Sequence, residues 1–153
     1  MFAGLDDSEL IKVANLCYRR IYNRNSVIFD PETPTEDIFI LEGDNESVQI
    51  EIPINDPEDR IIIHTLSKGE TFGWAALSSN HVRTAIARCL EEVRVIAING
   101  KSLVHLLENN HHIGYLVMRN LADTISTRLV YTTVAFRHEI RKARKKSKLA
   151  VPP

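Results

Sequence analysis

The stretch Ser47–Ile54, SVQIEIPI, alternates apolar and polar residues along its whole length. Branched apolar side chains occupy every second position, at Val48, Ile50, Ile52 and Ile54. Successive side chains of a strand point to opposite faces, so a period of two predicts a strand with one buried face. This segment therefore indicates a β-sheet that covers a core on one side.

Short apolar runs on both sides of this stretch predict further strands. We expect them at residues 26–29, 37–42, 60–66, 84–89 and 93–98. The turn-rich segments DPETPTE, EGDNES, NDPED and SKGE separate them, as is typical of hairpin connections. Many short strands at regular spacing favour an antiparallel barrel or jelly roll over alternating βα units.

Helical patterns flank the predicted strands. Asp6 and Glu9 have the spacing of a capping box ahead of apolar residues at helical spacing, which predicts a first helix over about 7–18. Asn99 is the predicted N-cap of a helix over 100–110. The predicted fold class is α+β, mainly β: an antiparallel jelly-roll barrel flanked by an N-terminal helix and a long C-terminal helix.

That long C-terminal helix is predicted from about His112, with no breaker before Pro152. Apolar residues recur along it at spacings of three and four, which is typical of packing against a partner helix. Its first two turns are expected to pack on the chain's own barrel. Beyond Arg128 the barrel is expected to be too short to cover it, so we predict a parallel homodimer. The stripe comprises Met118, Leu121, Ile125, Leu129, Thr132, Phe136, Ile140 and Ala143.

The composition is that of a globular domain, with 44% hydrophobic and 25% charged residues in 153. We expect one domain, with a jelly roll over 1–110 and the long helix over 111–148. No apolar run approaches the roughly 20 residues that span a bilayer, so we expect no membrane contact. The start MFAGLDDSEL lacks a secretory signal pattern and predicts a cytoplasmic chain. Cys17 and Cys89 have no CxxC spacing, so buried, reduced thiols are expected.

The net charge of −1 hides an asymmetry between the two ends of the chain. Residues 137–148, RHEIRKARKKSK, hold seven Lys or Arg residues against Glu139, while 12 basic and 19 acidic residues make up the rest. This basic end is either a solvated helix terminus, which the helix dipole favours, or a contact for nucleic acid or an acidic partner.

One further stretch holds the residues that predict a binding site for an anion: Thr71–Arg88, TFGWAALSSNHVRTAIAR. Residues 74–77 have the propensity for one helical turn with Gly73 at its start, and glycine lets an anion approach the free N–H groups there. Arg83 can supply a bidentate counter-charge and Thr84 a hydroxyl. Phosphate is the anion that best matches these parts. Alone, the pattern is a weak signal, and a surface salt bridge is the simpler interpretation of Arg83.

In sequence order, however, the chain resembles the cyclic nucleotide-binding domain of the catabolite activator family and of cyclic-nucleotide-dependent kinases and channels. The segment GETFGWAALSSNHVRTAIA is similar to the phosphate-binding cassette of that family, including the five residues between Leu77 and Arg83. The resemblance implies a small jelly roll that holds a cyclic phosphate with backbone amides, an arginine and a hydroxyl. It assigns ligand contacts to Gly73, Ala75, Ala76, Arg83 and Thr84, and we predict Phe72 and Trp74 as further ligand-binding residues.

Trp74 departs from the family pattern, which has a glutamate directly after the glycine to accept a hydrogen bond from the ribose 2′-hydroxyl. A charge-assisted hydrogen bond contributes roughly 1.5 to 3 kcal/mol, so its loss weakens ribose recognition about tenfold to a hundredfold. An indole also occupies volume that a ribose needs, or stacks on a base, or serves as a core residue. Glu70 lies outside the helical turn and is not expected to substitute.

Other chemistries find little support in the sequence. The six histidines form no ligand constellation, so no metal site is expected, although His81 lies inside the cassette loop. No catalytic residues are predicted, since no nucleophile–base order or carboxylate pair stands in a motif, and we expect no enzyme activity. In the activator family a helix-turn-helix follows the long helix; this chain stops at Pro153, so sequence-specific DNA binding is not expected from it.

Two hypotheses remain open. The first is a ligand-sensing module that takes a phosphate-bearing small molecule, such as a cyclic nucleotide, at Gly73, Arg83 and Thr84 and transmits binding through the long helix. The second is a degenerate domain that serves as a dimeric scaffold, with Trp74 filling the vacated pocket. Dimer contacts in either case are assigned to Met118, Leu121, Ile125, Leu129 and Phe136.

Overall fold

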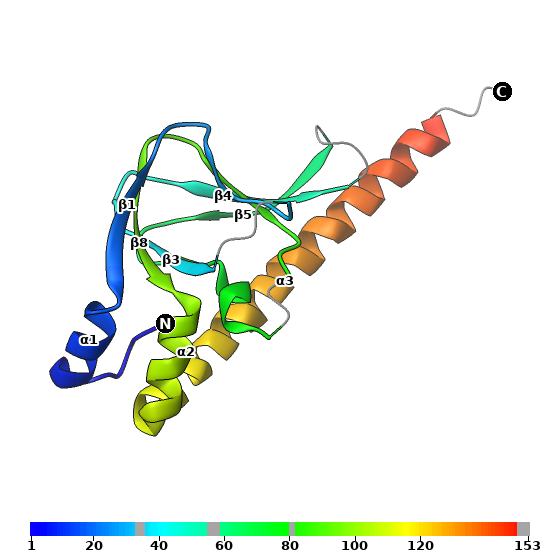
Figure 1. Ribbon diagram of the computed structural model, residues 1–153. Coiled ribbons are helices and arrows are strands. Elements are labelled where there is room, and N and C mark those ends of the chain that lie inside the picture. The colour runs from blue at the N-terminus through cyan, green and yellow to red at the C-terminus, as the bar shows by residue number, and fades with distance from the viewer. Residues whose placement is uncertain (33–35, 55–58, 80–81, 150–153) are drawn as a thin grey trace.

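The protein forms two antiparallel sheets joined to a set of helices, of which the last is long (Figure 1). The computed structural model describes residues 1–32, 36–54, 59–79 and 82–149, with side chains to residue 145. The strands are β1 Cys17–Tyr22, β2 Val27–Phe29, β3 Asp37–Leu41, β4 Val48–Pro53, β5 Arg60–Leu66, β6 Thr71–Phe72, β7 Ile86–Cys89 and β8 Val93–Asn99. The helices are α1 Asp7–Ala14, the 3₁₀ turn η1 Trp74–Leu77, α2 Gly100–Asn109 and α3 His111–Leu149.

The strands are divided between two four-stranded sheets, in the orders β1-β8-β3-β6 and β2-β7-β4-β5. Every pairing among the described strands is antiparallel. The expected antiparallel strands and flanking helices are confirmed, and the strands of the expected jelly-roll barrel form two sheets that do not close into a barrel. No strand pairing joins the two sheets in the described part of the chain, so they are held together by the side chains packed between them.

Three phenylalanine rings form the centre of that packing. Phe39 and Phe72 have ring centroids 5.3 Å apart, and Phe29 lies 6.2 Å from Phe39 and 6.1 Å from Phe72. All three are at least 95% buried, and Leu41 and Val95 pack in the same cluster with no exposed surface. Buried aromatic pairs add about 0.5–1.5 kcal/mol each beyond their area, so this cluster fixes the spacing of the sheets.

The alternation predicted for β4 is kept from Val48 to Ile52, because Val48 and Ile50 pack with the core between the sheets and Ile50 and Ile52 line one cavity. Val48 is fully buried, but the register with β5 shifts between Ile50 and Glu51. The extra residue of this bulge is Ile63 on β5, since Ile50 pairs with His64 and Glu51 pairs with Ile62. Glu51 is nevertheless buried, with ion pairs to Arg60 at 3.1 Å and Arg88 at 3.4 Å. The sequence period alone did not indicate this shift.

The chain enters β1 where the first helix was expected to continue. The capping box is confirmed, because Asp6 accepts the Glu9 N–H at 2.9 Å and Glu9 accepts the Asp6 N–H at 3.1 Å. The helix nevertheless ends at Ala14, and Cys17–Tyr22 pairs with β8. This edge strand is largely exposed, so it lacks the alternating pattern by which a strand is recognised.

A second core cluster lies where the three α-helices meet the sheet of β3 and β8. It comprises Leu5, Val13, Ile38, Ile98, Leu103, Leu107, Ile113, Leu116 and Val117. Asn99 caps α2 as expected and accepts the N–H of Ser102 at 3.1 Å. This cluster anchors the first turns of α3 to the body.

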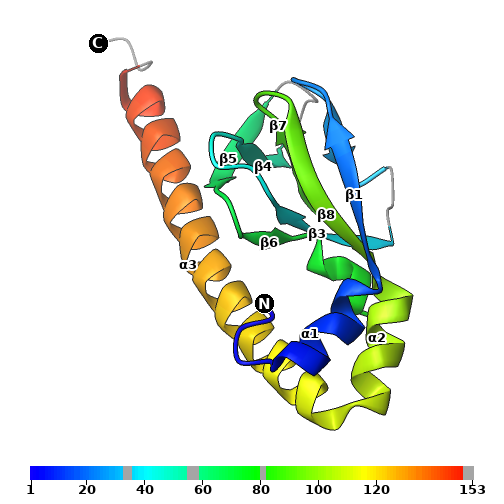
Figure 2. The same cartoon turned by 90° about the vertical axis from the view of Figure 1, so that its left-hand side faces the viewer.

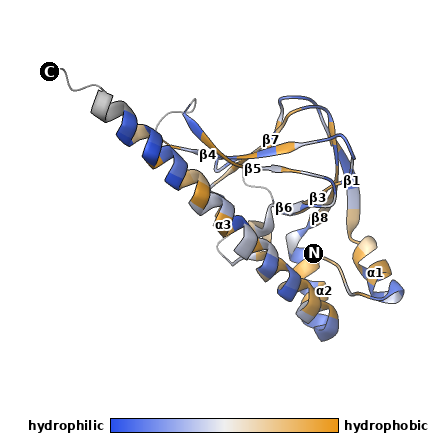
Figure 3. Ribbon diagram, turned by 180° about the vertical axis from the view of Figure 1, so that it is seen from behind, coloured by the Kyte–Doolittle hydropathy of each residue, from blue (hydrophilic) through white to orange (hydrophobic). Residues whose placement is uncertain are grey.

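Beyond the anchored turns, α3 runs along the β5 side of the sandwich (Figure 2). The Tyr131 ring stacks on His64 of β5 with centroids 4.9 Å apart, so the expectation that the body is too short beyond Arg128 is wrong. The last described turns project past the sheets in Figure 1 and are mainly hydrophilic in Figure 3. Among the described residues, no helix is long and apolar enough to cross a membrane.

The proposed dimer residues fall on two sides of α3. Leu121 is 4% exposed and packs on the chain's own body, contrary to its assignment as a partner contact. Four of the assigned residues remain exposed: Met118 at 51%, Ile125 at 41%, Leu129 at 66% and Phe136 at 37%. The stripe therefore splits into a covered edge and an open face.

Glu9 links α1 to α3 and makes this contact sensitive to acid. Its carboxylate accepts from His112 Nδ1 at 2.6 Å, and this hydrogen bond lowers the pKa of Glu9 below 4.5. A lowered carboxyl pKa contributes stability above pH 4.5 that is lost as pH falls through the folded value. Glu9→Gln removes the charge but keeps an acceptor for the capping box. We therefore expect the variant to have a lower thermal midpoint than the parent protein at pH 7 and the same midpoint as the parent protein near pH 3.

Circular dichroism melts of the parent and of Glu9→Gln at the two pH values test this expectation. Glu108→Gln, on an exposed part of α2, is the matched control and should change neither midpoint. A loss that is equal at both pH values would show that the carboxylate charge plays no part in the contact.

Candidate functional site

A cavity of about 240 Å³ lies between η1, the β4–β5 sheet and α3. Its walls are mostly apolar, and two arginines reach them from distant parts of the chain. The lining residues are Phe29, Ile50, Ile52, Ile63, Phe72, Gly73, Trp74, Ala75, Val82, Arg83, Thr84, Ala85, Arg128 and Thr132. An apolar cavity with a few convergent polar groups is the usual form of a small-molecule site.

Arg83 points into the protein, with only 8% of its surface exposed. Its Nη2 donates to the main-chain carbonyl of Asp37 at 3.0 Å, and its guanidinium carbon lies 4.2 Å from the centroid of the Phe29 ring. Burial lowers the pKa of Arg83, and the Asp37 charge offsets part of that effect. Arginine stays charged in proteins, so a fixed positive charge stands at one end of the cavity.

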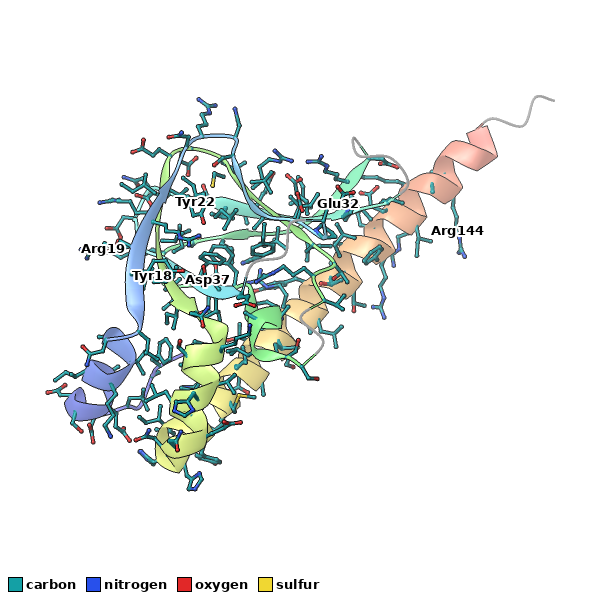
Figure 4. All side chains as sticks on the ribbon, viewed as in Figure 1. Tyr18, Arg19, Tyr22, Glu32, Asp37 and Arg144 are labelled. Atoms are coloured by element: carbon teal, nitrogen blue, oxygen red, sulfur yellow. The ribbon has the colours of Figure 1, made fainter. Side chains whose placement is uncertain are left out.

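Asp37, whose carbonyl accepts the hydrogen bond from Arg83, is itself held in place. The carboxylate of Asp37 accepts a hydrogen bond from the Tyr18 hydroxyl at 2.5 Å and lies 3.5 Å from Arg20; Figure 4 shows Tyr18 and Asp37 side by side. Desolvation and this hydrogen bond raise the pKa of Tyr18 to about 12. The start of β3 is therefore tied to β1 on one side and to Arg83 on the other.

Gly73 lies beside this guanidinium in a conformation that favours glycine. Its φ of 81° is in the left-handed region, and it caps the start of η1. A Cβ at this position would lie 3.1 Å from Arg83 Nη1 and 3.2 Å from the Asp37 carbonyl oxygen. The glycine therefore allows the turn and the guanidinium to approach closely.

Six of the seven predicted ligand contacts line the cavity, and Ala76 does not. Its side chain is 2% exposed, and a Cβ on Gly100 would lie 2.5 Å from its carbonyl oxygen, so Ala76 faces α2. Its N–H donates to the Gly73 carbonyl at 3.1 Å and is already used within the turn. Thr84 lines the cavity from an exposed position. His81 lies outside the described residues.

Trp74 lines the cavity instead of filling it. The indole is half-buried and packs against the second core cluster. The guanidinium carbon of Arg128 lies over the indole, 5.8 Å from the ring centroid, within the range of a cation–π contact. The sequence left three roles open for this residue, and its position leaves a flat aromatic wall beside an open cavity.

Arg128 and Thr132 were not identified as site residues from the sequence. Both come from α3, more than 40 positions after Arg83, and both line the cavity. Arg128 was treated only as the point where the body ends. The signal that could have identified it is a charged residue at helical spacing with buried neighbours on the inner face of α3.

Two of the histidines contact carboxylates in the described part of the chain. His64 Nε2 lies 2.9 Å from Glu70, and His112 Nδ1 lies 2.6 Å from Glu9. No group of three or more His, Cys, Asp or Glu side chains that could hold a metal ion occurs among the described residues. Cys17 and Cys89 are free thiols, the first half-buried and the second fully buried.

The two-sheet sandwich, the glycine-led turn and the inward-pointing arginine agree with the protein family that the sequence matches. The family model described as "Cyclic nucleotide-binding domain" matches residues 19–110, more than half of the chain. The chain therefore belongs to the cyclic nucleotide-binding domain family. Its family and fold are those of regulatory domains.

Solved structures show the same fold. A putative cyclic nucleotide-binding protein from Geobacter metallireducens is 27% identical, with a TM-score of 0.70 over 84% of this chain and 90% of that one. The Thermus thermophilus catabolite activator protein is 20% identical, with a TM-score of 0.68 over 97% and 61%. The regulator CLP from Xanthomonas campestris is 21% identical, with a TM-score of 0.71 over 97% and 66%. The chain thus spans less than two thirds of the length of the last two proteins.

The close approach of Arg83 to Gly73 predicts that a methyl group at residue 73 lowers the stability of the protein. Gly73→Ala places a Cβ in a left-handed position and against Arg83, and we expect a loss of about 1–3 kcal/mol in the free energy of unfolding. Gly69→Ala is the matched control, because Gly69 has a φ of +80° and nothing within 4 Å of its added Cβ. Urea unfolding measures both variants. Equal losses would show that the contact with Arg83 adds nothing.

Proposed function

We propose that this chain is a ligand-sensing regulatory module that binds a phosphate-bearing small molecule, a cyclic nucleotide or a variant of one, at Gly73, Arg83 and Thr84. The observation that carries the proposal is the buried guanidinium of Arg83 at the end of an apolar cavity, next to a glycine-led turn. A guanidinium binds phosphate oxygens through paired N–H donors, and the apolar walls suit the remainder of a nucleotide.

Binding is proposed to act on α3. Arg128 and Thr132 belong to α3 and line the same cavity as Arg83, so a ligand there touches the body and the helix together. A ligand shifts a conformational equilibrium only if its contacts differ between the two states. A ligand held jointly by Gly73, Arg83 and α3 favours the arrangement in which the helix lies against the cavity.

The ligand class rests on the family and on two proteins of the same fold. The Xanthomonas campestris regulator CLP is described as responsive to c-di-GMP, and the regulatory domain of a Toxoplasma gondii kinase has been crystallised with cAMP. We therefore propose cyclic mononucleotides and cyclic dinucleotides as the compounds to test first. A protein or peptide ligand finds no comparable support in the cavity.

Titration calorimetry with cyclic AMP, cyclic GMP and cyclic di-GMP tests the phosphate role of Arg83. Arg83→Lys keeps the charge but removes the planar fork, and we expect the affinity to fall about tenfold to a hundredfold. Arg94→Lys is the control, because Arg94 lies on β8 outside the cavity and pairs with Glu46 at 2.7 Å. No heat with any nucleotide in the parent protein would end the proposal.

A second candidate function is a dimeric interaction scaffold, favoured by the open apolar face of α3. Ile125, Leu129, Phe136 and Ile140 are between 37% and 66% exposed and lie along one side of the helix. A helix with such a face associates with another apolar surface, and a parallel copy of α3 provides a matching stripe. In this alternative the nucleotide cavity is vestigial, and the association is the output.

Leu129→Glu tests the association. A charge at this 66%-exposed position leaves the folded chain intact but opposes pairing, so we expect the dimer to dissociate to monomers, as measured by sedimentation. Val130→Glu introduces the same charge at a 58%-exposed neighbour about 100° around the helix and should leave the dimer unchanged. A monomeric parent at high concentration would contradict the scaffold function.

A further inference from the structure

The last described turns of α3 carry a row of arginines. Arg137, Arg141 and Arg144 follow one another at spacings of four and three residues within the helix. At about 100° per residue, their side chains lie within about 60° of one another around the axis. All three are exposed, and Figure 4 shows Arg144 extending from the helix clear of the sheets. The end of α3 therefore presents one continuous cationic face.

This arginine row lies on the side of α3 that faces away from the body. His138, Glu139 and Lys142 line a hollow together with residues 60–62 of β5. At about 100° per residue, the middle of this inner side is about 150° around the helix from the arginine row. The sheet therefore covers one side of the helix and leaves the arginines open to a partner.

The arginine row has no acidic counterpart in the chain. None of its three members forms an ion pair with a carboxylate in the described part of the protein. Glu139, the one carboxylate in residues 137–145, pairs with Lys142 at 2.7 Å and lies 3.6 Å from His138. Like charges three and four positions apart on a helix repel one another, so negative charge placed along the row would relieve this repulsion.

The acidic body does not supply that negative charge. Outside residues 137–148 the chain has 19 acidic and 12 basic residues. The Tyr131 ring is still stacked on β5, but Arg144 lies about 20 Å further along the helix axis. That distance is about twice the Debye length at 0.1 M salt, and the helix end projects past the sheets in Figure 1. The body therefore neutralises little of the charge on this end of the helix.

We propose that the arginine row docks on the phosphate backbone of duplex DNA, independently of base sequence. Guanidinium groups bind phosphate oxygens through paired N–H donors. The row is a rigid line, with rises of about 6 Å and about 4.5 Å between successive arginines. A DNA duplex carries one negative charge per about 1.7 Å of its axis, so phosphates meet all three arginines in any register.

The shape of the helix end also favours duplex DNA. An α-helix with its side chains is about 10–12 Å across, and the DNA major groove is about 12 Å wide. The major groove of duplex RNA is deep and narrow, which keeps a helix of this width away from the phosphates on both sides. This docking surface is separate from the ligand cavity, so the inference goes beyond the proposed function and does not depend on it.

Fluorescence anisotropy of the full chain with two labelled duplexes of unrelated sequence tests the inference. At 50 mM salt we expect binding to both duplexes with similar affinities. Each phosphate contact contributes about −0.9 to the slope of log K against log salt, so three arginines predict a slope of about −2.7 or steeper.

A triple variant locates the contact. Arg137→Gln, Arg141→Gln and Arg144→Gln together should lower the affinity at 50 mM salt at least about tenfold and reduce the slope by about 2.7. The matched control combines Arg24→Gln, Lys68→Gln and Lys101→Gln, which are exposed positions on the body. It has the same net charge as the first variant and should bind as the parent protein does. Melting curves verify that both variants fold.

Four outcomes would overturn the inference. These are no binding to either duplex at 50 mM salt, an equal loss of affinity in the two triple variants, a strong preference for one of the two sequences, or tighter binding to duplex RNA. Displacement of the labelled DNA by polyglutamate as readily as by unlabelled DNA of equal charge would assign the row to an acidic protein instead. Calorimetry with cyclic nucleotides is a separate measurement, so the failure of one proposal leaves the other standing.

Discussion

The structure depends on a buried guanidinium held between a strand and a turn. Arg83 is tied to the Asp37 carbonyl at 3.0 Å and stacks on Phe29, one of the three rings that separate the sheets. Removing a charge from water costs several kcal/mol unless it is compensated. The fold supplies that compensation with a carbonyl and an aromatic face, which leaves the guanidinium accessible from the cavity. The same residue thus joins the two sheets to the candidate phosphate site.

A second guanidinium, Arg128, connects this cavity to the long helix. Its carboxylate partner, Glu70, lies on the segment that leads into β6 and η1, and His64 of β5 holds Glu70 from the other side. The helix is therefore joined to the segment before the turn through one charged group, while Tyr131 stacks on β5 one turn later. Gly73 and Arg128 line one cavity within a single packed unit, so the turn and the helix are connected directly through these contacts. The dimer proposal uses the opposite, exposed side of that helix.

Much of the fold was predictable because its signals are local. The capping box at Asp6, the cap at Asn99 and the strands on both sides of β4 follow from backbone hydrogen bonding and from the period of apolar residues. Edge strand β1 was missed because an exposed strand need not alternate, and the bulge at Ile63 of β5 was missed because it depends on the pairing with β4. Gly73 and Arg83 could be assigned to one site because a local motif joins them. Arg128 could not, since its burial is decided by how α3 docks on the body.

The structure changes the interpretation of Trp74, the residue at which the chain departs from the family motif. The resemblance predicts that an indole in place of the family's glutamate weakens ribose recognition or fills the pocket. In the structure the ring packs against the helical core cluster and presents a face to Arg128, and the cavity beside it keeps about 240 Å³. The same substitution therefore removes an acceptor that the resemblance predicts and adds a flat wall to the cavity beside a buried cation.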